Sequence, residues 1–188
     1  NIWSAKADYE ATVFNFARLE AGAKWALSKT ANTTSRTETG PSAVNTGTRF
    51  KYRENIGGAY FSLAAQFGPK WSAKAGLRGE YTNSLGDWIT AGDQSKRSYF
   101  DLFPTAFVGF NPSAALRFSV SYTRRIQRPS YNTLNPVEYF VDAHTYTVGD
   151  PDLRPSYSDE ASFMAGFGQH FSVSTSFSHS SGLFSQLP

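Results

Sequence analysis

Apolar and polar residues alternate with a period of two along most of this 188-residue chain. In the clearest stretch, 116–123, one set of positions holds Leu116, Phe118, Val120 and Tyr122, and the other holds Arg117, Ser119, Ser121 and Thr123. Successive side chains of a β-strand point to opposite faces, so this spacing predicts a strand with one apolar and one polar face. A chain built from such segments needs a suitable solvent for each face.

The same alternation predicts seven further strands, at 1–14, 17–28, 48–67, 71–82, 99–110, 158–167 and 171–178. Segment 17–28 is rich in Ala, Leu, Glu and Lys, which favour helices. Its apolar residues nevertheless recur every two positions and not every three or four, which favours a strand. The predicted fold class is therefore all-β, with about eight antiparallel strands in a meander.

The connections between these strands alternate between tight and long. Tight turns are predicted near Asn15, Gly68, Asn111 and Gly168, and long polar loops at 29–47, 83–97 and 126–156. Outer-membrane β-barrels sort their connections in this way, with short turns on the periplasmic side and long loops outside. Aromatic residues also flank the tight turns, as in an interfacial girdle: Phe14, Phe16, Phe67, Trp71, Phe110, Phe167 and Phe171. Together these features predict an antiparallel transmembrane β-barrel.

The composition agrees with this interpretation. No stretch approaches the ~18 consecutive apolar residues of a membrane helix, whereas a barrel strand needs only alternate residues to be apolar. Charged residues are also sparse, at 18% of the chain. Many of them share the polar face of the strands, where a water-filled or plugged lumen would accommodate them: Lys6, Glu10, Arg18, Glu20, Lys24, Lys74, Arg78, Glu80 and Arg117.

Two other architectures alternate as well and stay open at this point. One is a soluble β-sandwich that binds a ligand and uses its aromatic residues to fill a core. The other is a small, self-closed eight-strand barrel with a structural role in the outer membrane.

Three motifs in the longest loop follow one another in a distinctive order. They are Arg128-Pro129-Ser130-Tyr131, Leu134-Asn135-Pro136, and Gly149, Pro151, Leu153 and Pro155 at alternate positions. With segment 75–82 and Leu102-Phe103-Pro104 upstream, this region resembles the outer-membrane β-barrel family of TonB-dependent receptors. Asp150 departs from the pattern, because the family usually has Asn there.

The resemblance implies an outer-membrane receptor that takes up a bulky nutrient of the siderophore or glycan class in Gram-negative bacteria. Such barrels have about twenty-two strands and a plugged lumen. Because the chain begins at Asn1 without Met or a signal peptide, we expect residues 1–188 to be a single domain and a portion of a larger barrel. The implied partners are outer-membrane lipid, an extracellular nutrient, and a TonB-type energy-coupling protein that acts through a plug absent from this chain.

The long loop supplies the candidate ligand-binding residues, which are Arg124, Arg125, Arg128, Tyr131, Tyr139, His144 and Tyr146. Guanidinium groups bind carboxylate and phosphate, and aromatic rings can stack on a sugar or siderophore. The alternatives are that the arginines pair with acidic residues of the wall and that the rings pack within the loop. A structural role in directing the loop is expected for Pro129, Leu134, Asn135, Pro136, Gly149, Asp150, Pro151, Leu153 and Pro155.

No motif for catalysis, a metal or nucleic acid stands out. His144, His170 and His179 lack metal-ligand spacing, cysteine is absent, and there is no Gly-x-Ser-x-Gly motif. The net charge of +3 is modest, and Arg124-Arg125 is the longest basic run. We therefore expect no enzymatic activity, no cofactor, no metal and no nucleic-acid partner.

Overall fold

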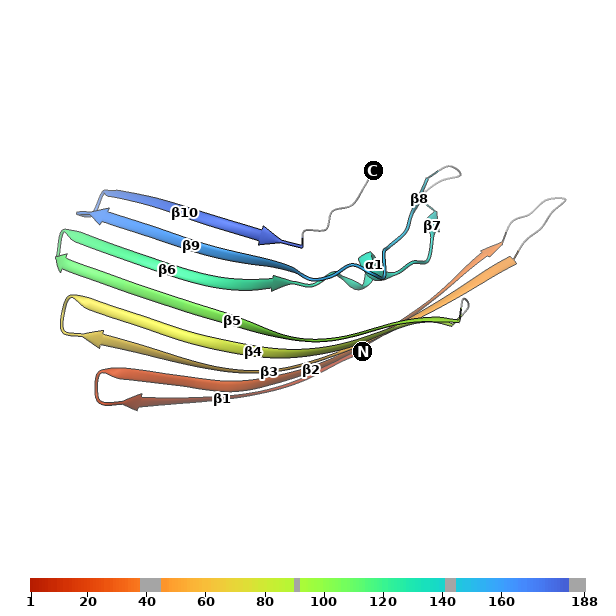
Figure 1. Cartoon of the computed structure of the whole chain (residues 1–188), viewed down its shortest axis with the longest axis horizontal. Coiled ribbons are helices and arrows are strands. Elements are labelled where there is room, and N and C mark those ends of the chain that lie inside the picture. Colours follow the sequence, from red (N-terminus) through yellow and green to blue (C-terminus); the bar gives the residue numbers. More distant parts are fainter. Residues whose placement is uncertain (38–44, 90–91, 141–144, 183–188) are drawn as a thin grey trace.

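The computed structural model describes residues 1–37, 45–89, 92–140 and 145–182. Its main feature is one antiparallel sheet of eight strands in the order β1-β2-β3-β4-β5-β6-β9-β10 (Figure 1). The strands are β1 (Ile2–Val13), β2 (Ala17–Thr37), β3 (Asn45–Phe67), β4 (Trp71–Trp88), β5 (Asp93–Ser113), β6 (Leu116–Gln127), β9 (Ser156–Phe167) and β10 (Phe171–Ser181). The predicted all-β meander is thus confirmed.

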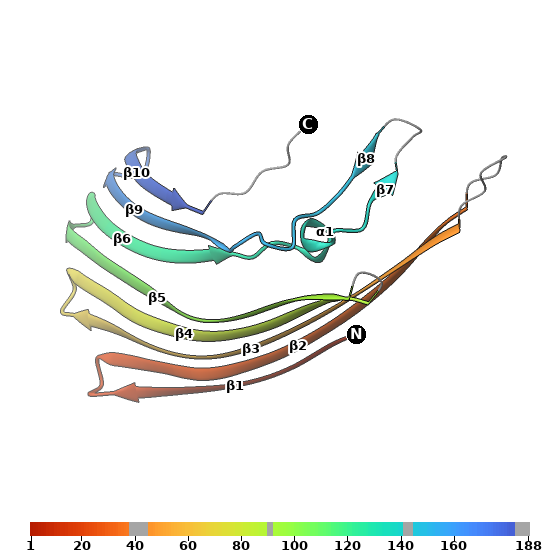
Figure 2. The ribbon, with the colours of Figure 1, turned by 45° about the vertical axis from the view of Figure 1, so that its right-hand side comes forward.

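The sheet is a single curved layer (Figure 2). Val120 on its apolar face is 54% exposed, and Leu116 and Phe118 are only partly covered. In the described part of the chain no second sheet covers this face, which excludes the sandwich alternative. β1 and β10 form the two edges of the sheet and do not pair with each other, so these eight strands do not close into a barrel by themselves.

The long strands correct two of the predicted loops. β2 and β3 continue into 29–47, and β4 and β5 continue into 83–97, with pairs such as Thr33 with Arg49 and Asn83 with Ser98. The loop predictions for these segments are therefore wrong apart from the tips, of which 38–44 and 90–91 lie outside the described residues. Strand ends that project beyond a membrane need no apolar face, so they pair without the alternation that would reveal them.

The tight turns lie at the opposite end of the sheet from the long connections (Figure 1). Phe14 and Asn15, with φ of 56° and 55°, make the first turn, and Gly68 and Gly168, with φ of 64° and 62°, lie in two others. The turn expected at Asn111 is displaced, because β5 continues to Ser113 through an irregularity in its pairing with β6. The chain then reverses at residues 114–115.

Two rows of aromatic residues bound an apolar band on the outer surface of β4 and β5. Trp71 pairs with Phe110 at the turn end, and Tyr81 pairs with Phe100 ten residues further along each strand. The same face between the two rows carries Ala73, Ala75, Leu77, Gly79, Leu102, Pro104, Ala106 and Val108. Ten residues span about 33 Å along a strand, or about 25 Å along the membrane normal at the usual barrel tilt, which is the height of a lipid-facing band.

A short insertion separates β6 from β9. It holds α1 (Tyr131–Leu134) and a small hairpin of β7 (Tyr139–Phe140) and β8 (Tyr146–Thr147). This segment corresponds to the predicted loop at 126–156 and is folded at its described positions. Within the described residues, no helix has the length and apolar character needed to cross a membrane.

Candidate ligand-binding site on the polar face and the folded loop

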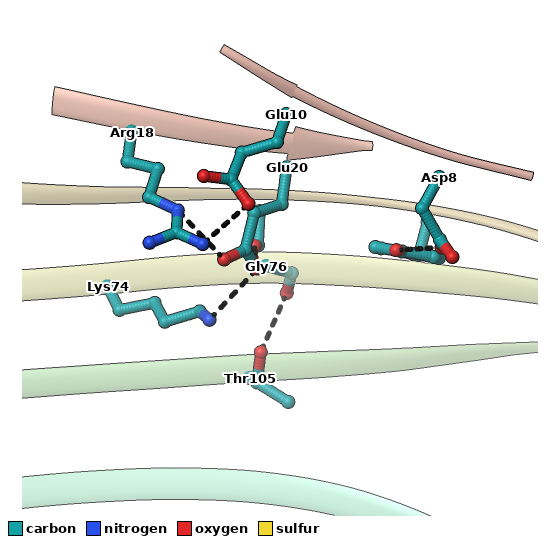
Figure 3. Close-up of polar contacts among 9 residues, drawn as sticks. Asp8, Glu10, Arg18, Glu20, Lys74, Gly76 and Thr105 are labelled. Atoms are coloured by element: carbon teal, nitrogen blue, oxygen red, sulfur yellow. Dashed lines mark hydrogen bonds and ion pairs between the residues drawn. The ribbon is translucent and has the colours of Figure 1, made fainter. Parts of the chain in front are cut away.

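An ionic network crosses the polar face of β1, β2 and β4 (Figure 3). Glu10 and Glu20 are direct register partners, and like charges in that position repel. Arg18 relieves the repulsion, because its Nη2 lies 2.5 Å from Glu10 Oε2 and its Nε lies 3.4 Å from Glu20 Oε1. Lys74 Nζ adds a contact of 3.3 Å to Glu20 Oε2.

Neutral groups extend this network across β3. Ser62 Oγ donates to Glu20 Oε2 at 3.1 Å, between the positions of the charged groups on β2 and β4. The side chains of Arg18 and Lys74 remain about half exposed. Exposed ion pairs are worth about 0–1 kcal/mol each, so the network makes this face hydrophilic more than it stabilises the sheet.

A second polar contact depends on the absence of a side chain. Tyr60 Oη on β3 donates to Asp8 Oδ1 on β1 at 2.5 Å, across the intervening Gly22 of β2. A Cβ at position 22 would lie 2.6 Å from Tyr60 Cε1 and 2.7 Å from Asp8 Oδ1. The glycine therefore allows side chains from two non-adjacent strands to meet.

The long loop is held in shape by its own backbone and short polar side chains. Ser130 caps α1, since its Oγ accepts from Thr133 N at 3.3 Å. Gly149 N donates to Asn135 O at 2.8 Å, and Asp150 N donates to Thr133 O at 2.9 Å. Asp150 Oδ1 in turn accepts from Asp152 N at 2.8 Å. The bonds from Gly149 and Asp150 join the segment that follows the hairpin to α1 and its C-cap.

Aromatic packing attaches this loop to the polar face of the sheet at its far end from the tight turns. The ring of Phe50 on β3 stacks between those of Trp88 and Tyr131, with centroids 5.2 Å and 5.4 Å away. Phe50 and Leu134 of α1 are buried here. The Tyr131 hydroxyl is buried without a hydrogen-bond partner among the described residues, and this burial raises its pKa.

Two arginines secure the beginning and end of the loop. Arg128 Nη2 lies 2.8 Å from Glu80 Oε2 and donates to Thr82 Oγ1 at 3.1 Å, and Thr82 is fully buried. Arg97 on β5 donates to the backbone carbonyls of Pro151 and Leu153. The loop is therefore clasped to β4 and β5 by charged hydrogen bonds, which are stronger than neutral ones.

The structure places the predicted ligand residues in different environments. Arg128 contacts Glu80 and Thr82, and Tyr131 stacks on Phe50, as described above. The Arg124 guanidinium lies over the Tyr157 ring at 5.3 Å from its centroid. Arg125 is exposed. Their role in ligand binding stays a prediction, and His144 lies outside the described residues.

The two tyrosines of the hairpin are accessible but separate. Tyr139 is 70% exposed and Tyr146 is 51% exposed. Tyr139 pairs with Thr147, and Tyr146 pairs with Phe140. Cross-strand partners share a face and neighbours along a strand do not, so Tyr139 and Tyr146 lie on opposite faces of the hairpin and do not form one platform.

A polar cleft of about 440 Å³ lies between the loop and the C-terminal end of β2. Its lining is rich in amide and hydroxyl groups and includes the ring of Tyr139, with Asn32, Thr34, Asn132, Asn135, Val137, Thr147 and Gly149. Amides both donate and accept hydrogen bonds, so this surface suits a hydroxyl-rich ligand. Sequence reasoning missed Asn32 and Thr34 because their segment was assigned to a loop. In the described part of the chain no cluster of three or more acidic or histidine side chains could hold a metal ion.

The comparisons with known proteins agree with this geometry. The model of the outer membrane protein beta-barrel family matches residues 1–188. The chain belongs to this family. Members of the family lie in the outer membrane, which places the apolar face of this sheet against lipid and its polar face toward the lumen. The outer-membrane location and the barrel class predicted from the sequence are thus confirmed.

Solved structures add a likeness of fold. Thirteen chains match, among them the ferric citrate transporter FecA in its unliganded form, with a TM-score of 0.57 and 12% sequence identity. The match covers 88% of this chain and 27% of the transporter, so the chain spans about a quarter of that protein. No protein of curated function matches the chain.

Proposed function

We propose that this chain forms part of the barrel wall of a TonB-dependent receptor that takes up a bulky nutrient of the siderophore or glycan class. The observation that carries the proposal is the folded loop, which the family-like motifs build and which Arg97 and Arg128 clasp to the lumenal face. It forms a polar cleft at the extracellular end of the wall, where a nutrient would first arrive.

The open edges of the sheet and the likeness to about a quarter of a ferric citrate transporter support a wall completed by further strands. In this proposal the chain provides a hydrophilic wall and a first contact site. The plug and its contact with the energy-coupling protein belong to other parts of the receptor. The proposal includes no catalytic step and no cofactor.

Uptake measurements with the complete parent polypeptide test the proposal. Cells that lack this polypeptide are compared with wild-type cells for accumulation of labelled ferric siderophores and labelled oligosaccharides. We expect cells that lack the polypeptide to lose uptake of one of these substrates. Cells that lack the energy-coupling protein are expected to lose uptake of the same substrate. Uptake of that substrate independent of the coupling protein would refute active transport by this receptor.

A matched pair of variants in β2 tests the cleft. Asn32 lines the cleft, whereas Thr33, the next residue of the strand, faces the opposite side. Asn32→Ala is expected to raise the nutrient concentration for half-maximal uptake about 5–10-fold, because one hydrogen bond to the ligand is lost and its polar partner left unpaired. Thr33→Ala is expected to have no effect. If the two variants had the same nutrient concentration for half-maximal uptake, the cleft would not be part of the nutrient-binding site.

A further inference from the structure

Four basic side chains gather on the lipid-facing side of the sheet, beyond the apolar band. We name Lys29, Lys51, Arg53 and Lys96 the outer basic cluster. Lys29 and Arg53 are register partners, and Leu85 separates Arg53 from Lys96 across β4. Arg53 lies four residues before Gly57, which pairs with Trp25 and Tyr81, so the cluster shares the face of the aromatic row.

The height of the cluster places it beside lipid headgroups. Lys29 lies four residues beyond Trp25, and Lys96 lies four residues before Phe100. Four residues correspond to about 13 Å along a strand and about 10 Å along the membrane normal. Headgroups occupy about 5–8 Å outside the hydrocarbon region, and long basic side chains bend toward them. Because the long connections are extracellular, these headgroups are those of the outer leaflet.

The cluster carries an excess of positive charge. All four side chains are exposed, and none makes an ion pair with another described residue in this structure. Asp87, the register partner of Lys51, is the carboxylate on this face in the described part of β2–β5. It accepts a hydrogen bond from Gln94 at 3.4 Å. By contrast, carboxylates on the opposite face engage Arg18 and Lys74.

The side chains border a groove. Its volume is about 460 Å³, and its lining includes Lys29, Lys51 and Arg53 with Ala31, Leu85 and Asp87. Apolar side chains thus lie next to cations, as a ligand with a charged head and an apolar body requires. These six residues all lie on the lipid-facing side of their strands.

We propose that the outer basic cluster binds the phosphorylated headgroup of a lipid in the outer leaflet. Ammonium and guanidinium groups are the usual protein partners of phosphate, and basic pockets at headgroup level select anionic lipids. A free anion would meet the same charges, but only a lipid brings its phosphate to this height while its acyl chains lie against the apolar band below. This inference depends on the outer-membrane location and is independent of the transported nutrient.

The experiment uses the complete parent polypeptide in nanodiscs of phosphatidylcholine doped with lipid A, followed by native mass spectrometry of the protein released from them. We expect the wild-type protein to retain lipid A. The combined variant Lys29→Gln, Lys51→Gln, Arg53→Gln and Lys96→Gln is expected to lose it, at about fivefold in affinity for each charge removed. The control, Lys24→Gln with Lys70→Gln, removes exposed charges from the polar face and a tight turn and is expected to retain lipid A.

Two further arms separate the sources of phosphate. Dephosphorylated lipid A is expected to bind no better to wild-type protein than to the combined variant. Millimolar inorganic phosphate is expected not to displace lipid A. Displacement by inorganic phosphate would show a simple anion site, and equal retention by wild-type protein and the combined variant would refute the proposal. Folding of the combined variant is judged by the faster-migrating band that a closed barrel gives on an unheated gel. If that band is absent, Arg53→Gln and Lys96→Gln are measured separately with the same criteria.

Discussion

Close backbone approaches at single residues shape the loop. Gly149 is the clearest, because a Cβ there would lie 2.6 Å from Asn135 O and 2.7 Å from Thr133 O. Both neighbours are backbone atoms that cannot move aside as a flexible side chain can. The glycine of the third loop motif therefore serves the contact between α1 and the second strand of the hairpin.

Gly149→Ala is expected to loosen the loop and to cost about 1–3 kcal/mol, because a backbone contact must open to admit the methyl group. Limited proteolysis of the parent polypeptide in detergent is the measurement, with faster cleavage within 128–155 expected. Gly57→Ala is the control, since a Cβ there would have no neighbour within 4 Å. An unchanged rate of cleavage in Gly149→Ala would show that the close backbone contact at Gly149 is not needed to hold the loop in shape.

Neighbouring residues of β6 test the assignment of the two faces. Val120 lies in the apolar band beside Val108 and Phe163, whereas Ser119 lies on the polar face. Val120→Arg is expected to lower the free energy of unfolding by about 2–4 kcal/mol at mid-bilayer, and Ser119→Arg to have little effect. Denaturant titration of the parent polypeptide in lipid vesicles measures both, and equal effects would contradict the assignment.

The loop acts as one element because charged contacts fasten it at both ends. Arg128 and Glu80 are 48 residues apart in sequence, and their side chains are only 20% and 15% exposed. At the other end, the backbone at Pro151 and Leu153 accepts from Arg97. The stacked rings of Phe50, Trp88 and Tyr131 are part of the same interface.

Arg128→Ala is expected to release the start of the loop, because it leaves the largely buried Glu80 carboxylate without this partner. Breaking a buried pair costs about 3–5 kcal/mol, and we expect about half of that because Arg78 Nε remains 3.2 Å from Glu80 Oε1. Hydrogen exchange of amides in 128–155 is the measurement. Arg117→Ala, which removes an exposed cation from β6, the strand that directly precedes Arg128, is the control. Equal exchange in both variants would show that the clasp does not order the loop.

At the scale of the molecule, the eight strands form an open wall whose two faces meet different solvents. The apolar band of β4 and β5 matches the thickness of the bilayer core, and the ionic network lies on the other face. Unpaired backbone groups at β1 and β10 would be costly in lipid, so both edges need partners there. The prediction of one domain that belongs to a larger barrel stays a prediction.

Residues 1–188 alone are expected not to give the compact, faster-migrating band that closed barrels show on unheated gels, because both sheet edges remain open. The complete parent polypeptide is expected to give that band and to lose it on boiling. Refolding of both into the same detergent makes the comparison direct. A compact band from residues 1–188 alone would show that these strands close by themselves.

Local patterns in the sequence were sufficient for much of this fold. Period-two alternation identified eight strands and their faces, and glycines and polar residues identified three of the four tight turns. The loop motifs marked the segment that packs on the polar face. The ends of β2–β5 were missed, because polar strand extensions such as Thr30–Thr34 pair through their backbones and show no alternation. The cleft lined by Asn32 was missed with them.

The sequence by itself determined which side chains face lipid and which face the lumen, since that follows from the parity of each position along a strand. Only the tertiary structure decided which distant residues meet. Strand register brings Glu80 to Arg128 and Tyr60 to Asp8, and it places Lys29, Arg53 and Lys96 of three strands at one level beside the lipid headgroups. Register is a property of paired strands, so no single segment contains it.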